Sequence, residues 1–171
     1  MKKALAIISG ILFLCTIALP LFSLYMRVAA FVLAIPVALS LVITYLTKPP
    51  TKTGAIVMAV FSVATGVVGC FMTIHVMPGI MAVLVGVLIF TRLYPSAINK
   101  YLLAIAILCM VVSCGQSANV ISSSIRTYGA GFSDAASSAD VASNAVGESL
   151  LTLCLLFSFI SIYPKQKEVI R

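Results

Sequence analysis

Long apolar runs alternate with short polar or proline-containing segments along the whole chain. The stretch between Lys52 and Arg92 contains no Asp, Glu, Lys or Arg, and as one straight helix it would be roughly 60 Å long, about twice the hydrocarbon thickness of a bilayer. We therefore expect it to cross a membrane twice and to fold back near residues 75–79. The full pattern predicts six spans, at about residues 4–25, 28–46, 54–74, 79–93, 101–121 and 148–163.

Runs of this length predict helices, because membrane-spanning strands are about 9–11 residues long and alternate in polarity. The predicted fold class is all-α: a polytopic helical membrane protein whose single domain is a compact bundle of six transmembrane helices. Residues 122–147, rich in Ser, Ala and Gly, form the one sizeable extramembrane segment. Within it Ser133 has the features of a helix N-cap, followed by Asp134 in the first turn. We expect one short extracytoplasmic helix there, either lying on the bundle or continuous with the sixth span, with a face of small side chains: Ala135, Ala139, Ala142 and Val146.

The composition agrees with a membrane protein. Hydrophobic residues make up 62% of the 171 residues and charged residues only 9%, against about 25% in globular proteins, so a water-soluble surface cannot be built from this chain. The net charge of +7 does not form a patch that would bind nucleic acid, because the basic residues are scattered singly or in pairs through short loops.

Those basic residues also predict the orientation of the chain. If the six spans alternate in direction, Arg27 and Arg126 fall on one side and the other nine on the side of the N-terminus: Lys2, Lys3, Lys48, Lys52, Arg92, Lys100, Lys165, Lys167 and Arg171. An excess of Lys and Arg marks cytoplasmic loops, so we expect both termini in the cytoplasm. Short loops without a glycosylation acceptor favour a bacterial cytoplasmic (inner) membrane.

Two spans carry small residues at every fourth position. Ala30, Ala34 and Ala38 do so on the second span, and Ser62, Gly66 and Cys70 on the third. Such stripes allow helix backbones to approach closely. They are interpreted either as internal packing seams or as a surface for another membrane protein.

The chain is poor in catalytic chemistry. No charged residue falls in the middle of a predicted span, which argues against an ion-coupled carrier and an intramembrane protease. One histidine and no Cys-x-x-Cys argue against a metal site, and we expect no enzyme and no cofactor. His75, at the predicted outer turn, is interpreted as an interfacial turn residue or as a pH-sensing or ligand-contacting group. Cys70 and Cys114, toward the outer ends of their spans, are candidates for a disulfide.

One polar concentration stands out at the outer ends of the last two spans and in the segment between them. It comprises Gln116, Asn119, Arg126, Asp134, Asp140 and Glu148. These residues either solvate an exterior loop or form a surface for an extracytoplasmic partner or ligand, since long polar connections in compact chains are often functional.

Two functions remain open. The first is a membrane-embedded binding or accessory protein, either a subunit of a complex or an immunity- or exclusion-type protein, whose partner is another membrane or extracytoplasmic protein or a second copy. The second is a small-solute-binding transport subunit. In length, span number and terminal orientation the chain resembles the substrate-capturing subunits of energy-coupling-factor vitamin transporters. That family carries its alanine motif on the first span, whereas here it lies on the second, so the resemblance is one of gross architecture.

Overall fold

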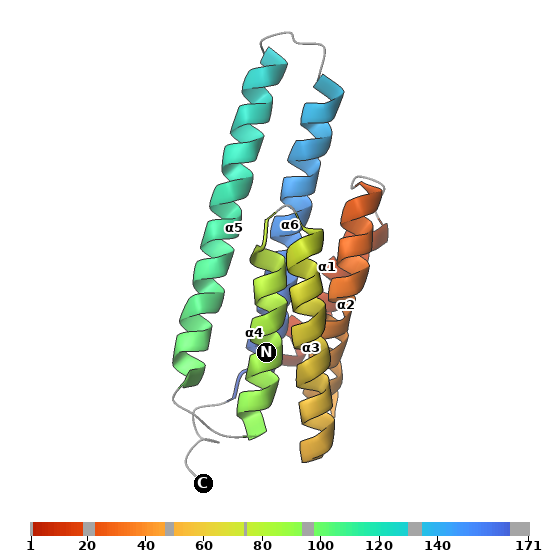
Figure 1. Ribbon diagram of the computed structural model, residues 1–171, viewed down its shortest axis with the longest axis vertical. Helices are drawn as coiled ribbons and strands as arrows, with labels where there is room; N and C mark the ends of the chain where they lie inside the picture. The colour runs from red at the N-terminus through yellow and green to blue at the C-terminus, as the bar shows by residue number, and fades with distance from the viewer. Residues whose placement is uncertain are drawn as a thin grey trace.

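The computed structural model describes residues 2–18, 23–46, 50–73, 75–93, 98–129 and 135–164, and it confirms an all-helical protein. Its six helices (Figure 1) are α1 (Lys2–Ala18), α2 (Leu24–Tyr45), α3 (Lys52–Met72), α4 (Met77–Leu93), α5 (Ile98–Gly129) and α6 (Ala135–Ile162). Four segments are long and apolar enough to cross a membrane: Met26–Tyr45, Lys52–Met72, Ile98–Arg126 and Ala139–Ile162. The helices α1 and α4 are shorter, with 17 residues each.

Successive helices run in opposite directions, so the connections gather alternately at the two ends of the bundle (Figure 1). The N-terminal end of α1 lies beside the C-terminal ends of α2 and α6. There the Lys2 ammonium donates a hydrogen bond to the carbonyl of Tyr163, and the Tyr45 hydroxyl donates to the carbonyl of Lys3. The opposite end carries the turn between α3 and α4 and the tips of α5 and α6.

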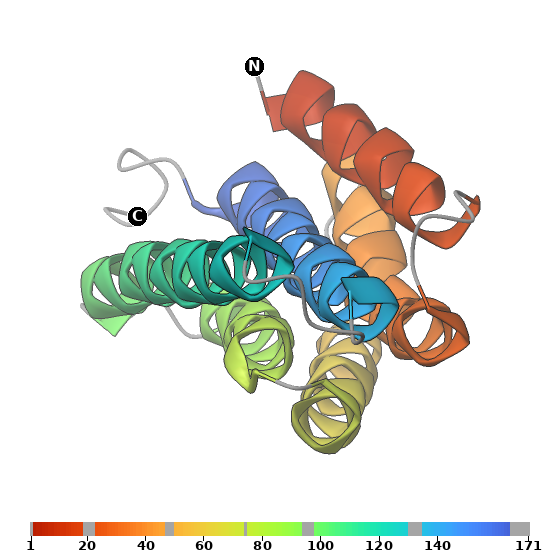
Figure 2. The same cartoon turned by 90° about the horizontal axis from the view of Figure 1, so that it is seen from above.

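Helix α6 is the centre of the bundle. It packs against α1, α2, α4 and α5, and it lies between them in the view from above (Figure 2). Its side chains fill the core, with Leu151, Cys154, Leu155 and Phe159 all fully buried. The apolar pattern emphasises residues 53–91, but the helix that the other helices pack around is α6.

The hairpin of α3 and α4 is the tightest helix pair. A Cβ built on Gly66 would lie 2.7 Å from the backbone nitrogen of Val83 and 2.8 Å from the carbonyl oxygen of Gly79. The Ser62 hydroxyl, one turn earlier on α3, donates to the carbonyl of Ala82 at 2.9 Å. Glycine and serine therefore let the two backbones meet without an intervening layer of side chains.

Residues 122–147 do not form a separate short helix on the bundle. Instead α5 continues to Gly129, and α6 runs from Ala135 through the predicted sixth span, which confirms the alternative of a continuous helix. Ser133 and Asp134 lie outside the described residues. No proline interrupts this part of the chain, and its alanines favour the continuation of both helices. Of the predicted small-residue face, Ala139 and Val146 are exposed and Ala142 is half-buried.

The two long helices extend past the rest of the molecule (Figure 1). With 32 and 28 residues, α5 and α6 are roughly 48 and 42 Å long, whereas the hydrocarbon layer is about 30 Å thick. We call residues 118–129 of α5 and 135–143 of α6 the projecting hairpin. The described part of the chain thus consists of a six-helix bundle and this extension of two of its helices.

Candidate functional site

A buried acidic side chain meets the single histidine at the base of the projecting hairpin. Glu148, on α6, is only 1% exposed. Its Oε2 accepts a hydrogen bond from the backbone N–H of His75 at 3.0 Å and lies 2.5 Å from the Nδ1 of the same residue. A carboxylate acceptor requires Nδ1 to carry the proton, so one oxygen receives two N–H groups from one residue. Buried carboxylates need such partners, because an unpaired charge away from water is very costly.

A second polar side chain of α6, Asn144, binds the residue that precedes α2. Asn144 lies one turn before Glu148, and its Oδ1 accepts a hydrogen bond from the backbone N–H of Ser23 at 3.3 Å. Ser23 is the N-cap of α2. Two consecutive turns of the central helix therefore receive backbone N–H groups from the α1–α2 and α3–α4 connections, and these contacts fix both connections at the same level of the bundle.

Hydroxyl groups join α5 to α6 beside this level. The Ser117 hydroxyl donates to the carbonyl of Ala145 at 2.8 Å and lies 2.5 Å from the hydroxyl of Ser149. One turn farther from the hairpin tip, the Ser113 hydroxyl lies 3.2 Å from that of Thr152. We call Ser113, Ser117, Ser149 and Thr152 the hydroxyl seam. Sequence reasoning missed it, although the i, i+4 spacing of two serines on α5 was a signal that could have revealed it.

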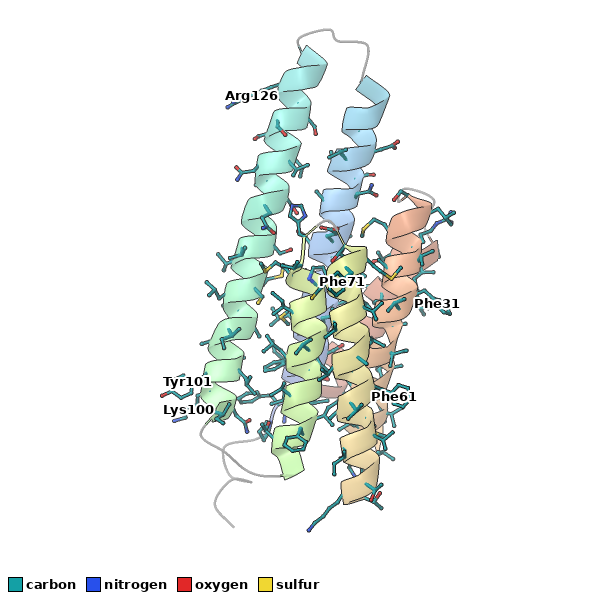
Figure 3. The ribbon with its side chains drawn as sticks, viewed as in Figure 1. Phe31, Phe61, Phe71, Lys100, Tyr101 and Arg126 are labelled. Carbon is teal, nitrogen blue, oxygen red and sulfur yellow. The ribbon has the colours of Figure 1, made fainter. Side chains whose placement is uncertain are left out.

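The predicted outer polar surface is only partly assembled on the projecting hairpin. Asn119, Arg126 and Asp140 are exposed there, and Arg126 points away from the bundle (Figure 3). Gln116 lies at the base of the hairpin and is half-buried, and its buried Oε1 has no hydrogen-bond partner among the residues that the structure describes. Asp134 lies outside the described residues.

Glu148 does not belong to that surface. Its charge had suggested contact with solvent, but its position on the most enclosed helix places it inside the bundle, against the α3–α4 connection. His75 lies at a turn, as the sequence predicted. Its contact with Glu148, 73 positions away along the chain, was not expected.

The two small-residue stripes have different surroundings. Ser62 and Gly66 are buried between α3 and α4, and the sulfur of Cys70 packs where a Cβ on Gly79 would lie. Ala30 is buried, Ala34 packs at the edge of the core, and Ala38 is exposed. A strict four-residue repeat rotates about 40° per step around a 3.6-residue helix, so the alanine stripe turns from the core to the outer surface. Its last residue is therefore not part of an internal seam.

The proposed disulfide between Cys70 and Cys114 is not formed. All five cysteines are free thiols, and Cys114 is exposed on α5. Cys70 lies on the α4 side of α3, with its sulfur 3.7 Å from the carbonyl oxygen of Val76. Within the described residues α3 and α5 are not packed against each other, so the two thiols sit on helices that do not meet.

An apolar groove of about 420 Å³ runs along the outer side of α3 and α4. Its lining includes Ala59, Val63, Gly86 and Phe90 and has no charged residue. Large exposed apolar side chains such as Phe31, Phe61 and Phe71 lie on the outside of α2 and α3 (Figure 3). Such a surface suits contact with lipid chains. In the described parts of the chain no group of three His, Cys, Asp or Glu side chains is placed to hold a metal ion.

Comparison of the chain with protein-family models, curated proteins and solved structures finds no match.

Proposed function

We propose that the protein is a multi-pass membrane protein that acts by binding a partner protein, as a subunit of a membrane complex or as an immunity- or exclusion-type protein. The observation that carries this proposal is the projecting hairpin, which extends beyond the other helices (Figure 1) and on which Asn119, Arg126 and Asp140 are exposed. A rigid helical extension presents side chains to a partner at the membrane surface with little ordering cost on binding.

The remaining polar groups support this view, because many of them already have a partner inside the chain. The hydroxyl seam joins α5 to α6, Glu148 holds His75, and Ser62 bonds to α4. These contacts serve the fold. The hairpin residues are different, since Asn119, Arg126 and Asp140 are exposed.

We further propose that all six helices cross the membrane, with both termini in the cytoplasm of a bacterium and the projecting hairpin outside. At 17 residues, α1 and α4 are each roughly 26 Å long, close to the hydrocarbon thickness of a bilayer. The nine-to-two division of basic residues supports the orientation. The partner is then another membrane protein, an extracytoplasmic protein or a second copy of this chain.

Native mass spectrometry of the protein, gently extracted from membranes of its own host, tests the docking proposal. We expect a stoichiometric protein partner that is lost when Asn119, Arg126 and Asp140 are replaced together by Ala. The matched control replaces Ile107, Leu108 and Val111, exposed apolar residues of the same α5, by Ala and should retain the partner. A partner retained by the hairpin variant, or the absence of any partner in the wild type, would contradict the proposal.

A second candidate is a small-solute-binding transport subunit. It is favoured by Gln116, whose buried Oε1 has no hydrogen-bond partner among the described residues and is therefore available to a ligand. In the same mass spectra this function predicts a retained small molecule instead of a protein, and its loss on Gln116→Leu. The two functions are thus separated by what remains bound.

A further inference from the structure

The apolar groove on the outer side of α3 and α4 is a fixed feature of that helix pair. Of its lining residues Ala59 and Gly86 are buried, whereas Val60 and Phe90 are exposed, so small residues lie deepest and larger ones at the edge. A Cβ built on Gly86 would lie 2.8 Å from the carbonyl oxygen of Ala59, so the two helices already touch there and closer approach cannot fill the groove. Its volume of about 420 Å³ falls within the range of ligand sites, roughly 300–1,000 Å³.

The groove lies at the depth of a single leaflet. On α3 its lining begins at Ala59, seven positions after Lys52, and ends at Ala64. At 1.5 Å per residue it lies roughly 10–18 Å from Lys52 along the helix. Lys52 is the first residue of a segment that is long and apolar enough to cross a membrane, so its charge belongs at the headgroup level. One leaflet contributes about 15 Å of hydrocarbon, so the groove faces the lipid chains on that side.

Lys52 also stands in line with the groove. Residues at i+7 and i+11 return to nearly the same direction around a helix, and Ala59 and Val63 occupy these positions relative to Lys52. Both therefore lie within about 20° of Lys52 around the axis of α3. The Lys52 side chain is exposed, so a positive charge lies at the surface at this end of the groove.

The other lysines at this end of the bundle are placed differently. The Lys2 ammonium donates a hydrogen bond to a main-chain carbonyl just beyond α6, and the Lys3 ammonium lies 5.4 Å from the centre of the Tyr45 ring. Lys100 is exposed (Figure 3), but it belongs to α5, which does not pack against α3 within the described residues. Among the side chains that the structure describes, Lys52 is thus the cation aligned with the groove.

We propose that this groove and Lys52 together bind one anionic phospholipid, with an acyl chain in the groove and the phosphate beside the Lys52 ammonium. The lining without charged residues suits the chain, and the lysine suits a headgroup of net negative charge. The site lies toward the end of the molecule opposite the projecting hairpin (Figure 1). This inference therefore goes beyond the docking proposal and does not depend on it.

A second copy of this chain fits the groove less well than a lipid does. In a two-fold dimer centred on the groove, the Lys52 side chains of both copies would lie at the same level of the membrane. Like charges repel, and a phospholipid phosphate would instead neutralise the single lysine.

Native mass spectrometry of lipid retention tests the proposal. The protein is reconstituted into nanodiscs that contain equal amounts of phosphatidylglycerol and phosphatidylcholine with identical acyl chains, and is then released into a mild detergent. We expect one retained lipid per protein, with phosphatidylglycerol favoured roughly fivefold, the effect of one lysine at an anionic membrane surface. Because the chains are identical, the ratio of the two lipids reports the headgroup contact and their total reports the groove.

Variants separate the headgroup contact from the groove. Lys52→Gln should bring the ratio close to one, whereas Lys100→Gln, at an exposed lysine of the same end, should leave it unchanged. Ala64→Leu places a larger side chain in the groove and should lower the retention of both lipids by a similar factor. Ala38→Leu makes the same change at an exposed position of α2 and should retain lipid as the wild type does.

Equal retention of the two lipids by the wild type, or no retained lipid at all, would overturn the proposal. An equal loss of preference in Lys52→Gln and Lys100→Gln would also overturn it, since net charge alone would then explain the result. A dimer that Ala64→Leu dissociates would show that a second copy occupies the groove instead. If Ala64→Leu does not fold, the comparison of the two lysine variants still decides the outcome.

Discussion

Gly66 stands where α3 touches the backbone of α4, and its lack of a side chain is what permits that contact. Its hypothetical Cβ lies 2.7 Å from Val83 N and 2.8 Å from Gly79 O, and these main-chain atoms cannot yield as a flexible side chain would. We expect Gly66→Ala to destabilise the protein by about 1–3 kcal/mol, and Gly66→Leu to disturb folding or assembly more strongly. Unfolding followed by circular dichroism in detergent micelles measures the loss.

Gly115 provides the matched control for this prediction. It also lies within a helix, but nothing comes within 4 Å of a Cβ built on it. Gly115→Ala should be neutral or slightly stabilising, because alanine favours helices more than glycine does. Equal effects of the two alanine substitutions would show that helix propensity, and not the approach of α3 to α4, decides the outcome.

Single residues also show where sequence reasoning succeeded and where it did not. The spacing of Ser62 and Gly66 indicated a packing face, and both residues are buried against α4. The burial of Glu148 was not predicted, because a charged residue near the end of an apolar run ordinarily indicates solvent. Its enclosure depends on His75, and a contact between such distant positions leaves no local pattern in one sequence.

At the scale of helices, the hydroxyl seam predicts how α5 is held to α6. Ser117 bonds to both the carbonyl of Ala145 and the hydroxyl of Ser149, so Ser117→Ala removes two contacts across the interface. We expect a loss of about 0.5–1.5 kcal/mol, the usual range for such bonds between membrane helices. Ser122→Ala is the control, because its exposed hydroxyl bonds only within α5, to the carbonyl of Asn119. Equal losses for the two variants in the same unfolding assay would contradict the role of the seam.

The lengths of the helices were harder to predict than their positions. The apolar runs located all six, because the bilayer requires about 20 apolar residues for each crossing. They did not reveal that α5 continues beyond residue 121, since the hydrophobic signal ends there while the helix does not. That α6 begins before residue 148 was an alternative that the sequence left open. Helix propensity and the hydrogen bonds of α5 to α6 sustain the extension, and neither appears in a hydropathy pattern.

The whole molecule is built around α6, so the chain completes its core only when its last helix is in place. Leu151, Leu155 and Phe159 are each fully buried, and α6 packs against α1, α2, α4 and α5. The sequence did not single out this helix, because its mixture of Ser, Thr, Cys and Leu is less apolar than the runs of α2 and α3. Small and polar side chains nevertheless allow four helices to pack around one, with hydroxyls such as Ser158 bonded to α1.

The proposed orientation of the bundle leads to the last prediction. It is tested by labelling introduced cysteines with a membrane-impermeant maleimide. Three exposed residues are suitable sites: Thr53 at the start of α3, Lys100 at the start of α5, and Ser122 on the projecting hairpin. In a background with Cys15 and Cys114 replaced by Ala, Ser122→Cys should react in intact cells. Thr53→Cys and Lys100→Cys should react only after permeabilisation, because two crossings, α3 and α4, separate them and return the chain to the same side.

The short helix α4 is the decisive element in that experiment. If its 17 residues do not span the bilayer, Thr53→Cys and Lys100→Cys will fall on opposite sides, and the six-span arrangement is wrong. If both react in intact cells while Ser122→Cys does not, the spans stand but the orientation is reversed. The expected pattern requires that basic residues such as Lys52 and Lys100 stay in the cytoplasm. The projecting hairpin, which carries Arg126 and Asp140, then faces the other side of the membrane, where an extracytoplasmic partner would bind it.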